Sequence, residues 1–256
     1  IPCNWKFAAE NFLGDTYHNV SHRSVDLIGI GPSAEAGVKG RRDNEMEKAQ
    51  HVWANFPAGH GVHSAIMPQD WEFLNTYQNN PVVAEYFREA HAKRKERLGA
   101  ERHRLIPFVG TIWPNTSFHG NQPRNLCVWH PHGPESTEAW RFFLVDADAP
   151  QEVKDFLRIY YMRYSGPAGM TEQDDMENWN YATAGSRGVI ARRYPFNYQQ
   201  SLGKVSTDAP VPGNVSVQVS EENPRQFYRR WRDYMNGADW DTLLGRKDKE
   251  PASFAA

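Results

Sequence analysis

Short apolar runs alternate with turn residues through the middle of the chain. The segments FVGTIWPNTSFHG, NLCVWHPHG and AWRFFLVDA are aromatic and β-branched, and proline, glycine and asparagine separate them. An earlier segment, HVWANFPAGHGVHSAIM, is broken in the same way at Pro57 and at Gly59-His60-Gly61. Apolar runs of this length between turn residues are typical of strands joined by hairpins. The pattern therefore predicts a pair of strands followed by an antiparallel meander.

Other segments carry apolar residues at the wider spacing that is typical of helices. They lie at about residues 7–22, 80–104, 148–164, 171–185 and 223–235. A sheet of hairpins with helices before, between and after its strands belongs to the α+β class. We expect one antiparallel β-sheet wrapped by helices in a single domain over residues 1–245, followed by a C-terminal tail at residues 246–256.

The first of these helical segments, AENFLGDTYHNVSHRS, has an unusual polar face. Read as a continuous helix, it places Asn11, Asp15, His18 and His22 four, three and four residues apart. That spacing normally carries the apolar stripe that faces a core. Two imidazoles four residues apart on a helix can reach one ion. The alternative is a pair of partly exposed surface histidines.

A cluster of acidic residues lies far downstream in the segment EQDDMEN, at Glu172, Asp174, Asp175 and Glu177. Acidic residues also favour an exposed helix N-terminus, so a solvated helix start is the alternative reading. Two histidines and one carboxylate suit a non-haem Fe(II) site with open coordination positions. A zinc hydrolase could use the same ligands, although the sequence contains no HExxH motif.

Composition narrows the possible functions. The 256 residues carry a formal net charge of −2, which gives no indication of binding to nucleic acid or to an anionic membrane. The two cysteines, Cys3 and Cys127, form no disulfide framework and no cysteine-based metal site. Residues 105–123 contain no Asp, Glu, Lys or Arg. Prolines and glycines interrupt this run, so we do not expect it to span a membrane. These features fit a cytoplasmic protein.

Two motifs together resemble a known family. The stretch NWKFAAENFLGDTYHNVSH at residues 4–22 and the stretch GPAGMTEQDDMENW at residues 166–179 are similar to the catalytic domain of the large (α) subunit of Rieske-type aromatic-ring-hydroxylating dioxygenases. The segment TIWPNTSF and the strand pair around GPES extend the resemblance between the motifs. It implies a helix-grip-like fold and a non-haem iron catalytic domain.

The resemblance also implies roles for individual residues. The ligands of Fe(II) would be His18, His22 and Asp175. Asp15 would link an iron-ligand histidine to the Rieske cluster of the adjacent subunit, and Asn11 would lie near the iron. The implied substrate pocket is lined by Phe12, Thr16, Val20, Ser165, Met170 and Thr171. Because relatives often carry larger aromatic groups in place of Ser165 and Thr171, a polycyclic or otherwise bulky aromatic substrate is favoured.

The implied reaction is the O2-dependent cis-dihydroxylation of an aromatic ring, with electrons from NADH passing through a reductase, a ferredoxin and a [2Fe-2S] Rieske cluster. The chain lacks the Cys-x-His and Cys-x-x-His pairs that hold such a cluster, so we expect the Rieske domain upstream. The family implies a trimer of α subunits with a small β subunit (α3β3). A non-catalytic binder of hydrophobic ligands and a zinc-dependent hydrolase are the alternatives.

Overall fold

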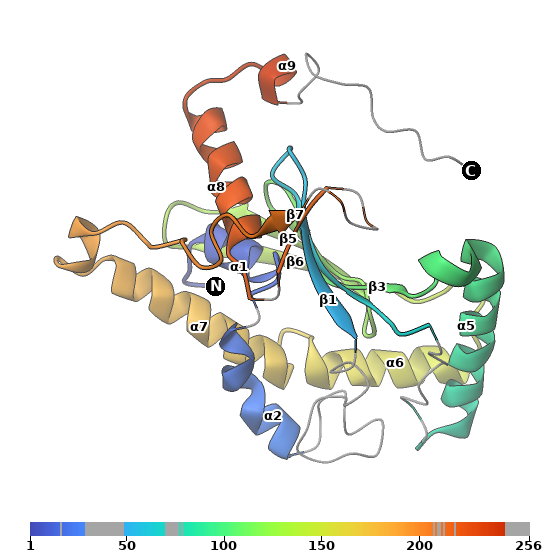
Figure 1. The fold of residues 1–256 in the computed structure, drawn as a ribbon. Helices are drawn as coiled ribbons and strands as arrows, with labels where there is room; N and C mark the ends of the chain where they lie inside the picture. Colours follow the sequence, from blue (N-terminus) through green and yellow to red (C-terminus); the bar gives the residue numbers. More distant parts are fainter. Residues whose placement is uncertain are drawn as a thin grey trace.

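The computed structural model describes residues 1–15, 17–28, 49–69, 77, 79–206, 208, 211, 213–217 and 219–243. Within these residues, one antiparallel sheet has the strand order β6-β5-β4-β3-β2-β1-β8-β7 (Figure 1). Its strands are β1 (Gln50–Asn55), β2 (Gly61–Ile66), β3 (Leu105–Ile112), β4 (Thr116–His119), β5 (Asn125–Pro131), β6 (Thr137–Phe143), β7 (Val205–Ser206) and β8 (Asn214–Ser216). The predicted strand pair and the predicted meander, β3 to β6, are confirmed.

Helices surround this sheet and confirm the α+β class. They are α1 (Trp5–Asn11), α2 (Arg23–Leu27), α5 (Pro81–Arg102), α6 (Gln151–Tyr164), α7 (Met170–Ser186), α8 (Glu222–Met235) and α9 (Trp240–Leu243), with 3₁₀ turns η1 (Tyr17–His22) and η2 (Ala191–Arg193). In Figure 1, α6 and α7 follow one another below the sheet, α5 stands at its right and α8 rises above. Among the described helices, none is both long and apolar enough to cross a membrane. The predicted tail, 246–256, lies outside the described residues.

An aromatic core holds α1 and α7 against the sheet. Phe12, just after α1, packs against Trp129 of β5 with ring centroids 5.7 Å apart, and Trp129 contacts Trp179 of α7 edge-on at 5.4 Å. The indole N–H of Trp129 donates a hydrogen bond to Ser117 Oγ at 2.9 Å, so its polar edge is also satisfied. Buried aromatic residues contribute large apolar contact areas and favour such tilted geometries. This core fixes the two elements that carry the predicted motifs.

A second core joins α6 to α5. The residues Val153, Leu157, Tyr160 and Tyr164 are four, three and four positions apart and are all buried. They form one face of the helix and pack in a cluster with Val83, Ala84 and Phe87 of α5. The apolar spacing of α6 therefore explains both its helical structure and its docking. Helices α5 and α6 thus pack together, and α6 is followed along the chain by α7.

The prediction of one continuous helix over residues 7–22 is wrong. Helix α1 ends at Asn11, and the chain turns through Gly14, whose φ is +106°. The indole N–H of Trp53 donates a hydrogen bond to the Gly14 carbonyl at 2.6 Å, and a Cβ at Gly14 would lie only 2.6 Å from that nitrogen. A left-handed backbone and this close approach both require glycine. The histidines therefore lie on the separate 3₁₀ turn η1.

We predict that Gly14→Ala destabilises the protein more than an alanine at another glycine with positive φ. Gly99 has a φ of +77° but no heavy atom within 4 Å of the Cβ position. Both substitutions introduce backbone strain, and only Gly14→Ala also forces Trp53 and His63 to move. The free energy of unfolding should fall by roughly 1–3 kcal/mol more for Gly14→Ala than for Gly99→Ala. Denaturant unfolding of the two variants measures the difference, and equal losses would contradict it.

Candidate metal centre

The turn η1 and the helix α7 bring two histidines and one aspartate together. Asp175 Oδ1 lies 3.2 Å from His22 Nε2 and 3.4 Å from His18 Nε2. The two imidazole rings are nearly perpendicular, at 85°, with centroids 4.9 Å apart. One ligand atom from each of the three residues lies within 4.8 Å of the other two. The structure thus unites the three residues predicted as iron ligands, although they come from distant parts of the sequence.

The donor atoms fit a metal ion better than a hydrogen-bonded network. Asp175 is 7% exposed, and its Oδ1 has no hydrogen-bond partner among the described residues. A buried carboxylate oxygen without a partner is unfavourable. At metal–ligand distances of about 2.0–2.2 Å, ligand atoms at right angles lie about 3 Å apart. The separations of Oδ1 from the two Nε2 atoms are close to this value, so one small cation could satisfy all three groups.

Each histidine has a carboxylate near its second ring nitrogen. His18 Nδ1 lies 3.6 Å from Asp15 Oδ2, and His22 Nδ1 lies 3.3 Å from Asp174 Oδ2. Histidines that bind metals usually donate the other ring N–H to such a group, which fixes the tautomer and raises the basicity of the ligand. Asn11 adds a second neighbour to His18, with Nδ2 3.1 Å from Nδ1. Asn11 Nδ2 also lies 3.5 Å from His18 Nε2, and the Nε2 atoms of His18 and His22 lie 3.4 Å and 3.2 Å from Asp175 Oδ1.

Electrostatics favour a cation at this position. Burial disfavours the charged form of His18, but its hydrogen bond to Asp15 and the charge of Asp175 outweigh burial and raise its pKa above the ordinary value. The raised pKa shows that His18 is surrounded by negative charge. The carboxylates of Asp15, Asp174 and Asp175 converge on two imidazoles, and a divalent cation would neutralise much of this charge.

The candidate metal centre opens into a cavity of about 1430 Å³. This volume exceeds that of a typical small-ligand pocket, which is about 300–1,000 Å³. Several residues predicted to lie at the site line the cavity, namely Asn11, Phe12, Asp15, His18, His22, Ser165, Thr171 and Asp175. Further along, its wall is aromatic and polar, with Trp53, His63, Phe108 and His119 among the lining residues. The cavity can therefore hold a ligand of more than one ring beside the metal ligands.

Two of the predicted pocket residues, Val20 and Met170, are not among the described residues that line the cavity. Val20 is 81% exposed and does not line the cavity. A 3₁₀ turn advances about 120° per residue, so the side chain two positions after His18 points away from it. Met170 opens α7 and packs against the core between α5 and α6 instead. The sixth predicted pocket residue, Thr16, lies outside the described residues.

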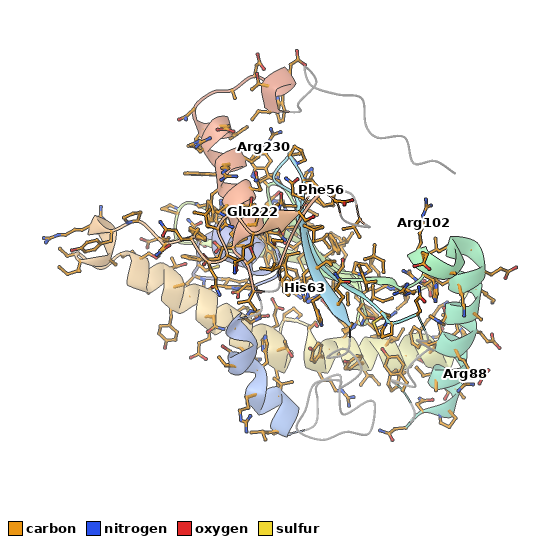
Figure 2. All side chains as sticks on the ribbon, in the orientation of Figure 1. Phe56, His63, Arg88, Arg102, Glu222 and Arg230 are labelled. Atoms are coloured by element: carbon orange, nitrogen blue, oxygen red, sulfur yellow. The ribbon has the colours of Figure 1, made fainter. Side chains whose placement is uncertain are left out.

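The sequence reasoning missed several residues at the site. Asp174 belongs to the acidic cluster, but the sequence pattern indicated no role for it. Its position directly before the predicted ligand Asp175 was the only sign that it lies at the site. The ring of His119 of β4 contacts the ring of Phe12 at a tilt of 57°, with centroids 4.9 Å apart, and burial together with the charge of Arg141 lowers the pKa of His119 to about 4. His63, labelled in Figure 2 on the strand pair β1–β2, stacks on Trp53 at 4.3 Å and contacts His51 Nδ1 at 3.0 Å. The pattern of their strands gave no sign that these two histidines face a cavity.

Fold and site together define an α+β domain with a candidate metal centre of two histidines and one carboxylate. The sequence profile of the ring hydroxylating alpha subunit (catalytic domain) family matches residues 1–237. The chain belongs to this family.

Named relatives agree with this assignment. The chain is 37% identical over 256 residues to the biphenyl dioxygenase subunit alpha of Paraburkholderia xenovorans (strain LB400), covering 95% of this chain and 53% of the relative. It is 37% identical over 252 residues to the benzene 1,2-dioxygenase subunit alpha of Pseudomonas putida, covering 95% of this chain and 54% of the relative. The chain therefore spans about half the length of these relatives.

Solved structures share the fold. The structure of naphthalene 1,2-dioxygenase with indole bound in the active site matches with a TM-score of 0.76 and 24% identity, over 96% of this chain and 55% of that chain. Naphthalene 1,2-dioxygenase from Rhodococcus sp. bound to indole matches with a TM-score of 0.66 and 26% identity, over 93% of this chain and 55% of that chain.

We predict that Asp174→Asn weakens metal binding without removing a ligand. The amide keeps the size of the carboxylate but loses the charge that orients His22. Loss of such a partner typically costs about 10–100-fold in metal affinity. Competition with a chromophoric chelator measures this affinity for Fe(II) under anaerobic conditions. Glu177→Gln, an exposed charge removal on the same helix, is the matched control, and equal effects of the two variants would contradict the prediction.

Proposed function

We propose that residues 1–245 form the non-haem iron catalytic domain of an α subunit that carries out the O2-dependent cis-dihydroxylation of an aromatic ring. The observation that carries this proposal is the convergence of His18, His22 and Asp175 at one end of a large cavity with aromatic walls. Membership of the ring-hydroxylating family, and the dioxygenase names of the relatives, support the same reaction.

In this proposal, His18, His22 and Asp175 hold Fe(II). When bound, the metal supplies the activation of O2, and the protein supplies ligands, orientation and a shielded cavity. Asp15 and Asp174 hold the protons on the Nδ1 atoms of the two histidines, which keeps both Nε2 atoms available. Phe12 and the neutral ring of His119, tilted at 57° to each other, both line the cavity that holds the candidate ligands and offer ring surfaces against which an aromatic substrate can pack.

The electrons would come from outside the described domain. We propose that NADH supplies them through a reductase and a ferredoxin to a [2Fe-2S] Rieske cluster in an upstream domain of the full subunit. The chain has only two cysteines and spans about half the length of its relatives, which leaves room for such a domain. We further propose an α3β3 assembly in the cytoplasm, in which Asp15 connects the iron site to the cluster of the neighbouring α subunit.

Metal content and product separate this proposal from its alternatives. Full-length protein, reconstituted anaerobically and dialysed, should retain one mononuclear iron per α subunit in addition to the two irons of the proposed [2Fe-2S] cluster. With the reductase, the ferredoxin, NADH and O2, it should convert biphenyl to a cis-dihydrodiol that carries both atoms of ¹⁸O2. Protein that retains zinc instead would support the hydrolase. Protein that binds biphenyl but holds no metal at His18, His22 and Asp175 would support the non-catalytic binder.

We predict that Ser165→Phe narrows the substrate range. Ser165 is 2% exposed and lines the cavity at the end of α6. A phenyl group there would fill space beside the metal, so turnover of a three-ring arene should fall much more than turnover of benzene. Product analysis across arenes of increasing size measures the change, with iron content as the control. An unchanged product profile would place Ser165 away from the substrate.

We predict that Asp15→Asn blocks electron delivery while leaving iron in place. The amide keeps one acceptor oxygen near His18 but removes the charge, and none of the three metal ligands is altered. In the full-length protein, we expect near-normal iron occupancy, an intact trimer and a large loss of turnover. Rapid mixing of the reduced protein with substrate and O2 follows reoxidation of the cluster. Reoxidation at the wild-type rate would show that Asp15 is not part of the electron route.

A further inference from the structure

A buried arginine on the sheet reaches the corner between α6 and α7. Arg141 of β6 donates a hydrogen bond from Nη1 to the backbone carbonyl of Ser165 at 2.9 Å. Its Nη2 forms an ion pair with Glu172, in the first turn of α7. The side chains are 5% and 4% exposed, and the guanidinium also lies over the ring of Trp129 at 5.5 Å. One planar group thus contacts the end of one helix, the start of the next and the sheet.

The corner has little other side-chain support at the start of α7. The residue before the helix is Gly169, which offers no side-chain cap. Gly166 and Gly169 pack so closely on the last turn of α6 that a Cβ at Gly169 would lie 2.7 Å from the Tyr164 backbone. Backbone hydrogen bonds hold the corner itself, such as Gly166 N–H to Tyr161 O and Gly169 N–H to Gly166 O, both at 2.7 Å. Arg141 provides a bond on each side of it.

The position of this anchor bears directly on the candidate metal centre. Glu172 lies three residues before Asp175, so the two side chains are neighbours on successive turns of α7. Ser165 and Thr171, on either side of the corner, line the cavity. The charge of Arg141 also acts on Asp175 and on His119. Movement of the first turn of α7 would therefore displace the only predicted metal ligand that does not lie on η1.

We propose that Arg141 is a positioning residue for the metal centre: by binding Ser165 and Glu172 at once, it fixes the α6–α7 corner and sets the placement of Asp175 opposite the two histidines. This inference rests on the proposed iron site. Arginine suits the task because its rigid fork binds two acceptors in fixed directions, which the flexible ammonium of lysine cannot do. Arg141 is neither a candidate metal ligand nor one of the described residues that line the cavity. It acts through the placement of Asp175, so its replacement should appear first as a loss of metal affinity.

The test removes the buried ion pair without leaving an isolated charge. In the full-length protein, the double variant Arg141→Gln/Glu172→Gln replaces both charged side chains with neutral amides. It thereby avoids the instability caused by removing only one partner of a buried ion pair. The dissociation constant for Fe(II), measured anaerobically by chelator competition, should rise about 10–100-fold. The visible difference spectrum between Co(II)-loaded and metal-free protein, in which the absorption of the [2Fe-2S] cluster cancels, should also change, since it reports the arrangement of the ligands. Arg141→Lys, which keeps the charge but lacks the fork, should give an intermediate loss.

Helix α8 offers a matched control. Arg225 and Glu222 form a second buried ion pair at 2.7 Å, with both side chains 8% exposed. Figure 2 shows Glu222 on α8, well apart from the α6–α7 corner. Arg225→Gln/Glu222→Gln should leave the Fe(II) affinity and the Co(II) spectrum unchanged.

Three outcomes would overturn the inference. Wild-type affinity in both Arg141 variants would exclude a positioning role, as would an equal loss of affinity in the α8 control. A wild-type protein that retains no iron beyond that of the proposed [2Fe-2S] cluster would overturn the proposed iron site and this inference with it. The first two outcomes leave the proposed function intact.

Discussion

Three carboxylates close to the imidazoles of His18 and His22 are the constraint on which the rest of this structure depends. Asp175 is buried with an oxygen that has no hydrogen-bond partner among the described residues, while Asp15 and Asp174 lie against the outer nitrogens of the same histidines. Such an arrangement is costly for a folded chain unless a cation is bound. A cation bound there would therefore stabilise the folded chain, as expected where ligands are assembled only by folding.

Several parts of the fold serve to hold this arrangement. The break at Gly14 separates α1 from η1 and lets Trp53 bind the backbone at the turn, so the segment that carries both histidines is tied to the sheet. The aromatic core of Phe12, Trp129 and Trp179 sets the distance between α1, the sheet and α7. Rigid elements that meet through packed aromatic rings can hold metal ligands more accurately than loops can.

The cavity combines apolar aromatic rings with buried polar imidazoles. Aromatic rings provide flat apolar walls, while His119 and His63 add polar groups whose pKa values are lowered to about 4 and about 3, mainly by burial. Both rings are therefore neutral at physiological pH and can stack on an aromatic substrate without the cost of burying a cation. A large volume with neutral imidazoles suits bulky aromatic molecules better than small ions.

The sequence by itself predicted the strand pair, the meander and the helices α5 to α8, because apolar runs and their spacing are local signals. Its paired motifs, through their resemblance to a family, suggested the three candidate ligands. It did not determine the break at Gly14, since the motif reads equally well as a helix until Trp53 approaches the backbone. Nor did it place Val20 outside the cavity, because the direction of a side chain on η1 depends on a 3₁₀ geometry imposed by that break. Asp174, His119 and Arg141 gained their positions only from packing between elements distant in sequence. Contacts of this kind depend on how sheet and helices meet in space, and no local pattern of residues encodes that geometry.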